Sequence, residues 1–155
     1  MSSPSGRSMP VSAAELISSL LRDGIEVRVR LTGWSMKPLV PSGSVLRFAN
    51  GEPSIGDVVL ARLENDALVA HRVIALDRDR IWTKGDACRT ADGPLPRESV
   101  IARAVRREGK VPLPLSNVWM RYFGLAVNRL YPRLVALHTM VRALVPPTPR
   151  GESAP

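Results

Sequence analysis

The 155-residue chain contains one cysteine, few aromatic residues and no long apolar run. The single cysteine, Cys88, excludes a disulfide within the chain. Because aromatic residues make up only 5% of the sequence, the core is expected to consist of Val, Leu, Ile and Ala. An uninterrupted apolar run of about eighteen residues, as an ordinary transmembrane helix needs, does not occur. The N-terminal segment also lacks the apolar region of a secretory signal.

Positive charge and turn-forming residues are abundant instead. The formal net charge of +8 favours an acidic partner, either a membrane surface or a nucleic acid. Nucleic acid is the weaker candidate, because few aromatic side chains are available for base stacking. Fourteen prolines and eleven glycines indicate many turns and therefore a β-rich fold. We expect no cofactor and no metal ion, and the location is left open between the cytoplasm and the periphery of a membrane.

Alternation of apolar and polar residues predicts a mainly β, antiparallel domain behind a short N-terminal helix. Ser12 and Glu15 form a capping-box pattern, which predicts a helix that ends near Gly24. Apolar residues at alternate positions between Ile25 and Leu31 indicate a half-buried strand. Similar short runs at intervals of about ten residues favour antiparallel pairing. Strands are expected at residues 25–31, 44–48, 58–63, 67–76, 81–83 and 98–107, with a loop at 86–96.

Stretches rich in proline and small polar residues delimit this domain. Residues 1–11 and 146–155 are expected to be disordered, because they contain too few apolar residues to form a core. Pro112 and Pro114 mark the end of the β domain. The predicted domain therefore spans residues 12–110.

An amphipathic helical segment is expected over residues 115–145. Apolar residues recur every three or four positions from Trp119 to Leu144, which predicts one apolar helical stripe. Pro132 interrupts the stripe, so a kink or two helices are expected. The segment either covers the sheet or forms an α-hairpin, or it lies on an anionic membrane with its arginines directed to the headgroups. The polar side of the segment carries Arg121, Asn128, Arg129, Arg133 and Arg142.

Ser35 lies in a segment typical of a tight turn between two predicted strands. Residues 33–38 read Gly-Trp-Ser-Met-Lys-Pro, in which Gly33 permits a sharp backbone and Pro38 restricts the exit. A serine exposed in such a turn acts as a nucleophile when a base reaches its hydroxyl. His71, on the strand predicted over 67–76, is the candidate base, because histidine exchanges protons near neutral pH.

Four elements in order resemble a known family. After the turn come Ile-Gly-Asp-Val-Val at 55–59, His-Arg-Val at 71–73, and Lys-Gly-Asp at 84–86 with an aspartate six residues on. Over about residues 25–107 these elements resemble the type I signal peptidases, and more closely their archaeal and endoplasmic-reticulum branch, which has a histidine where the bacterial branch has a lysine. The resemblance implies an antiparallel β fold and a Ser–His endopeptidase that removes N-terminal leaders, usually after small residues. The implied partner is a peptide or preprotein with a cleavable leader.

The same resemblance assigns roles to individual residues. It implies Ser35 as the nucleophile and His71 as the general base, with Asp86 and Asp92 at the acidic positions of the last element. The residues around Ser35 are implied to contact the substrate; they are Gly33, Trp34, Met36 and Pro38.

The chemistry of these residues leaves several alternatives open. A carboxylate on the far imidazole nitrogen would orient His71, and both Asp86 and Asp92 are candidates for it. Backbone N–H groups of the turn, including that of Ser35, would stabilise an oxyanion. Each residue also has an ordinary structural interpretation: a turn serine, a core histidine on a valine-rich strand face, and aspartates that cap turns.

Two other residues are candidates for the reactive groups, and two functions other than that of a leader peptidase stay open. Lys84 is a rival base, because buried lysines lose their protons and LexA-type self-cleaving regulators use a Ser–Lys pair. Cys88 is a rival nucleophile, although it is more typical of a small loop or core residue. The alternatives to a leader peptidase are a catalytically inactive peptide- or membrane-binding domain of the same fold, and a LexA-type self-cleaving regulator.

Overall fold

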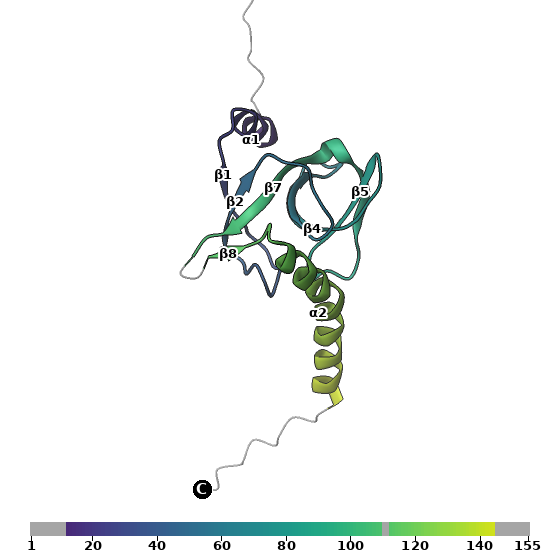
Figure 1. Cartoon of the computed structure of the whole chain (residues 1–155). Helices are drawn as coiled ribbons and strands as arrows, with labels where there is room; N and C mark the ends of the chain where they lie inside the picture. The colour runs from purple at the N-terminus through teal and green to yellow at the C-terminus, as the bar shows by residue number, and fades with distance from the viewer. Residues whose placement is uncertain (1–11, 110–111, 145–155) are drawn as a thin grey trace, which may run out of the picture.

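A computed structural model describes residues 12–109 and 112–144, in which one curled antiparallel sheet lies between two helices (Figure 1). The expectations for residues 1–11 and 146–155 lie outside the described residues. The helices are α1 (Ala13–Arg22) and α2 (Val118–Leu144), with a short 3-10 helix at Arg97–Ser99. The strands are β1 (Val27–Arg30), β2 (Val45–Ala49), β3 (Val58–Arg62), β4 (Leu68–Leu76), β5 (Arg80–Lys84), β6 (Asp92–Pro96), β7 (Val100–Arg107) and β8 (Leu113–Pro114).

The strand order is β1-β2-β7-β3-β4-β5-β6, with β8 paired to β7, so the predicted mainly β class is confirmed. All six predicted strands are present, with no end shifted by more than two residues. The expected loop at 86–96 is wrong in its second half, because residues 92–96 form β6 and pair with β5. Its sequence, Asp-Gly-Pro-Leu-Pro, reads as a turn, and such prolines are tolerated because β6 is an edge strand. The short strand β8 was not predicted.

The core lies on both faces of β3. Val58 and Leu60 point into a larger apolar cluster that includes Phe48, while Val59 and Ala61 point into a smaller one. Such burial on both faces fits the near-continuous apolar run of this strand. Its neighbour β4 is held in register along five residue pairs, which fixes the strand that carries His71.

Helix α1 forms as its capping box predicts. The Glu15 amide donates to the Ser12 hydroxyl at 3.2 Å, and the Ser12 amide donates to the Glu15 carboxylate at 2.9 Å. The helix ends at Arg22, and Gly24 follows with a φ of +77°, a conformation that suits glycine. Leu21 is buried in the larger core cluster, so α1 closes one end of the sheet.

Helix α2 runs through Pro132 without a break into two helices, so the two-helix alternative is wrong. Proline has no N–H, and the carbonyl of Asn128, four residues earlier, therefore lacks its helical donor. The Lys84 ammonium donates to this carbonyl at 2.8 Å. A side chain of the sheet thus replaces the missing hydrogen bond of the helix.

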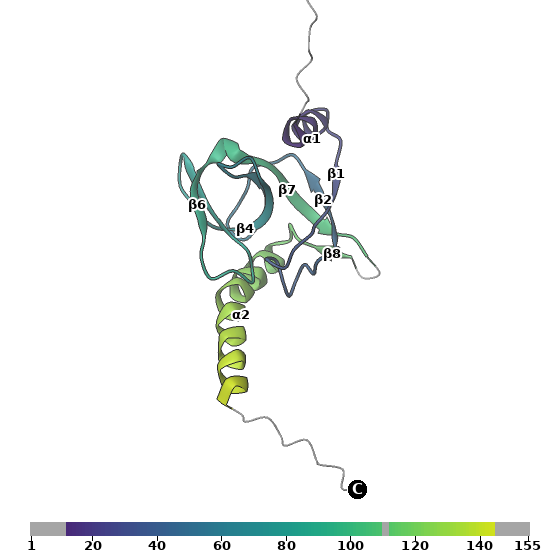
Figure 2. The same ribbon diagram turned by 180° about the vertical axis from the view of Figure 1, so that it is seen from behind.

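The orientation of α2 differs from the expectation that its apolar stripe covers the sheet. Asn128, on the polar side, is 4% exposed, whereas Trp119 is 81% and Leu134 61% exposed. The helix instead meets the domain through polar contacts, and its C-terminal half extends away from the sheet (Figure 2). Arg121 anchors it by an ion pair of 2.5 Å with the buried Asp57. Within the described ranges, no helix combines the length and apolar character needed to cross a bilayer.

Candidate active site

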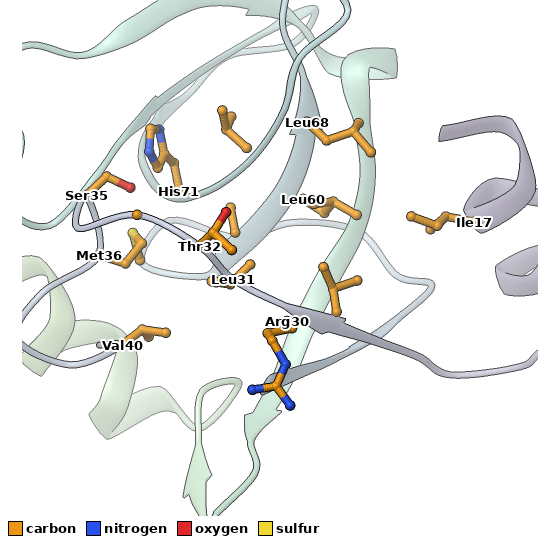
Figure 3. A pocket seen from close by; sticks show the side chains of 14 residues that line it. Ile17, Arg30, Leu31, Thr32, Ser35, Met36, Val40, Leu60, Leu68 and His71 are labelled. Atoms are coloured by element: carbon orange, nitrogen blue, oxygen red, sulfur yellow. The ribbon is translucent and has the colours of Figure 1, made fainter. Parts of the chain in front are cut away.

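Ser35 and His71 line the same pocket. Ser35 lies in the turn between β1 and β2, where Gly33 has a φ of +105° and so needs the freedom of glycine. His71 lies on β4 and is 8% exposed. Figure 3 shows the Ser35 hydroxyl and the His71 ring at the same end of the pocket. The structure therefore brings the predicted nucleophile and base together from positions 36 residues apart in sequence.

The rest of the pocket is mainly apolar. It has a volume of about 180 Å³ and extends from Ser35 toward α1. Ile17 and Leu68 lie at the end away from Ser35 (Figure 3). The strand ends of β1 and β4 form its walls, with Val29 and Leu31 on one side and Val69 and Ala70 on the other. An apolar side chain bound here would lie beside the Ser35 hydroxyl.

Sheet register brings Asp92 to His71. Thr83 on β5 is opposite Val73 on β4 and opposite Asp92 on β6. Because residues two apart on a strand share a face, His71, Val73, Thr83 and Asp92 all point to one side of the sheet. The His71 Nδ1 atom donates to Asp92 Oδ2 at 2.5 Å. Of the two aspartates that were candidates for orienting His71, Asp92 is therefore the one that contacts it.

Asp92 is itself held in place by a second donor. The Thr83 hydroxyl donates to the same Oδ2 atom at 3.0 Å. With Nδ1 bonded to a carboxylate, the proton of neutral His71 lies on Nδ1, and Nε2 is left as the basic nitrogen. This tautomer is the one that accepts a proton from a serine hydroxyl.

Asp86 lies on the opposite face of the sheet from Asp92. Both of its carboxylate oxygens accept hydrogen bonds from Arg72, at 2.8 and 2.7 Å. Arg72 follows His71 in β4, so its side chain points to the other face. Asn128 of α2 also donates to Asp86 at 3.0 Å. Asp86 thus forms a buried pair with Arg72 beneath α2 and does not contact His71.

The loop that follows β5 supports the Ser35 turn. The Ala87 amide donates to the Ser35 carbonyl at 2.7 Å. In the part of the chain that the structure describes, the Ser35 amide makes no hydrogen bond. An unpaired N–H beside a nucleophilic hydroxyl is the kind of donor that stabilises an oxyanion.

The two rival groups are placed less favourably for chemistry. The Lys84 ammonium is turned toward α2 and bonded to the Asn128 carbonyl, and Lys84 does not line the Ser35 pocket. Burial, together with the charge of Asp92, raises the pKa of the Cys88 thiol above its ordinary value of 9.0. Since the thiolate is the reactive form, this shift disfavours Cys88 as a nucleophile at neutral pH.

The residues that flank Ser35 divide into two groups. Gly33 and Met36 line the pocket, and Met36 is buried in the core cluster. Trp34 and Pro38 are exposed and lie outside the lining. The Lys37 ammonium is 3.8 Å from the centroid of the Trp34 ring, a cation–π contact on the outer side of the turn.

Sequence reasoning assigned no role to Arg72, Thr83 or Asn128. Arg72 interrupts a strand whose neighbours are buried, and a charge at such a position signals a buried partner. Thr83 and Asn128 give no such local signal, because their roles depend on the sheet register and on the docking of α2.

Residues 12–109 and 112–144 contain no group of three or more His, Cys, Asp or Glu side chains arranged to hold a metal ion.

No protein-family model, curated protein or solved structure matches this chain.

Proposed function

We propose that this protein is a serine endopeptidase that removes a leader, signal segment or propeptide from a peptide or preprotein. The observation that carries the proposal is the arrangement of Ser35 and His71 in one pocket, with Asp92 on the far nitrogen of the imidazole. Support also comes from the ordered motifs that resemble the type I signal peptidases. Four motifs in the same order are a more specific signal than any one of them alone.

The mechanism follows from these positions. The Ser35 hydroxyl oxygen attacks the carbonyl carbon of the scissile bond while His71 Nε2 accepts the hydroxyl proton. The imidazolium then protonates the leaving amine as the C–N bond breaks, which leaves the leader esterified to Ser35. Water, deprotonated by His71, hydrolyses this ester and restores the serine. Asp92 stabilises the imidazolium, and the Ser35 amide stabilises the oxyanion.

The proposed substrate binds in an extended conformation. Among the described strands, β1 pairs only with β2, and the β4–β5 register begins at Arg72, so residues 68–71 of β4 pair only with β3. Two strand edges with unpaired N–H and C=O groups therefore border the pocket. An extended peptide satisfies such groups by strand addition and places one side chain in the pocket.

The test is to compare protein N-termini in cells that carry wild type, Ser35→Ala or His71→Ala. Leaders that persist in both variants are the expected result and would identify the substrates. Ser19→Ala, an exposed serine on α1, is the matched control and should process as wild type. Normal processing in cells with Ser35→Ala would contradict the proposal.

The other two functions predict different results. A binding domain without catalysis predicts peptide binding by wild type and by Ser35→Ala with no cleavage by either. A self-cleaving regulator predicts that the purified chain shortens on incubation, which intact-mass measurement detects. The position of Lys84, bonded to α2, gives no support to the Ser–Lys chemistry of such regulators.

The second proposed partner is an anionic membrane surface, which the segment 115–145 would contact. Its support is the exposure of apolar side chains along α2 in a chain of positive net charge. Nucleic acid is not proposed as a partner.

A further inference from the structure

A cationic hollow of about 300 Å³ lies between α2 and the loop that follows β5. Its lining residues are Lys84, Arg89, Arg129, Pro132 and Arg133. Four of the five carry a positive charge, and none is acidic. The hollow is separate from the Ser35 pocket, with which it shares no lining residue.

The arginines of the hollow are available for a ligand. Among the described residues, Arg89, Arg129 and Arg133 form no ion pair and donate no side-chain hydrogen bond to another protein group. The two carboxylates nearest in sequence to Arg89 are already paired, Asp86 with Arg72 and Asp92 with His71. No Asp or Glu occurs between residues 109 and 151, so α2 contributes no acidic side chain to offset the charge. Such a cluster attracts a group with several acceptor oxygens, and phosphate is the best match to arginine.

An apolar groove continues from the hollow along α2. It has a volume of about 500 Å³ and shares Arg89 and Pro132 with the hollow. Beyond these two, its lining along the helix is Val135, Ala136, Thr139 and Met140. Met140 and Val135 are exposed, although they are apolar. A ligand that fills both parts has an anionic head and an apolar tail.

We propose that the hollow binds the phosphate of an anionic membrane phospholipid, with an acyl chain or the bilayer interior covering the adjoining groove. Charge complementarity favours the anionic head, and the continuous apolar groove favours a lipid over a free anion. The proposed membrane partner is thereby narrowed to an anionic phospholipid, and its binding does not depend on peptidase activity. The hollow is built on the loop whose Ala87 amide bonds to Ser35, so the bound bilayer would lie next to the peptidase site.

The experiment measures cosedimentation of the full chain with vesicles of phosphatidylcholine alone, or of an equimolar mixture with phosphatidylglycerol. We expect binding to the mixed vesicles and little to phosphatidylcholine. Arg129→Glu combined with Arg133→Glu should weaken the binding about tenfold or more. The control is Arg22→Glu with Arg78→Glu, which makes the same change in net charge at exposed sites on α1 and on the β4–β5 turn.

The possible outcomes test whether the hollow binds a lipid phosphate. Equal weakening in the two double variants would overturn it, because attraction would then depend on net charge alone. Equal binding to both vesicle types would also overturn it, because the protein would then show no preference for anionic headgroups. Val135→Ser with Met140→Ser should weaken binding without any change in charge. Saturable binding of inorganic phosphate, together with no binding to mixed vesicles, would overturn the assignment to a lipid.

Discussion

Gly85 lies so close to Ser35 that a side chain on Gly85 has no room. A Cβ atom at this position would be 2.9 Å from the Ser35 Cβ atom and 2.7 Å from its carbonyl oxygen. Real Cβ contacts are not this short, so any substitution must push the Ser35 turn away from the β5–β6 loop. The geometry of the turn therefore depends on glycine at residue 85.

Gly85→Ala is accordingly expected to reduce the rate of the proposed peptidase reaction at least about tenfold, because small displacements of reacting groups have large effects on rate. Thermal unfolding, followed in parallel, should change less than it does for a core truncation such as Phe48→Ala. The measurement is the turnover of a leader-containing substrate identified from the comparison of N-termini. Wild-type turnover by Gly85→Ala would mean that the close approach to Ser35 has no role in the reaction.

Asp92→Asn should lower the rate by about a hundredfold or more, because an amide disrupts the tautomer and charge balance of His71. Thr83→Val removes only the second donor to Asp92 and should have a smaller effect in the same direction. The rates of both variants are measured across a range of pH. A loss of folded protein lowers the rate by the same factor at every pH, whereas an altered orientation of His71 changes the shape of the pH profile. The assignment of Asp92 is contradicted if Asp86→Asn lowers the rate more than Asp92→Asn while both variants stay folded.

Lys84 and Pro132 should show coupled effects on stability. Lys84→Met leaves the Asn128 carbonyl without a donor, which costs about 1–3 kcal/mol in the free energy of unfolding. Pro132→Ala restores the helical N–H that bonds to this carbonyl, so Lys84→Met should cost less in the Pro132→Ala background. A double-mutant cycle from urea unfolding measures the difference. Strict additivity would show that the two groups do not share the carbonyl.

Glu108 gives a prediction of pH dependence. Hydrogen bonds from Arg47 and Arg28 lower the pKa of Glu108 below its ordinary value of 4.5. Because the folded pKa is depressed, the stabilisation is present above pH 4.5 and is lost as the pH falls through the folded value. Glu108→Gln should therefore be less stable than wild type at pH 7, with a difference that vanishes in acid.

The control for this experiment is Glu64→Gln, since Glu64 forms no ion pair within residues 12–109 and 112–144. Unfolding midpoints of both variants and wild type at pH 7 and pH 3 are compared. A constant difference between Glu108→Gln and wild type at the two pH values would contradict the prediction.

Local patterns in the sequence were sufficient for much of the fold. The capping box at Ser12 and Glu15 and the alternation in the early strands depend on neighbours in sequence, and the structure confirms them. Residues 92–96 could not be predicted as a strand, because their turn-like composition is overridden by pairing with β5. Tertiary contacts decided that element.

The residue types of the candidate site could be predicted from the sequence, but the contacts between these residues could not. Ser35 and His71 were singled out from motifs, and the structure places both in one pocket. The distinction between Asp86 and Asp92 depends on strand register, which no local pattern provides. The orientation of α2 was also inaccessible, because its inner partners, Asp57 and Asp86, lie more than forty residues away in sequence.

The outward-facing apolar residues of α2 also affect how the protein behaves in dilute buffer. Trp119, Phe123 and Leu134 are exposed, and exposed apolar area of this kind is covered whenever a second surface is available. Without a bilayer, the surface most readily available is the same helix on another copy of the chain. The number of protein copies per particle should therefore rise with protein concentration and fall when micelles of a nonionic detergent are added.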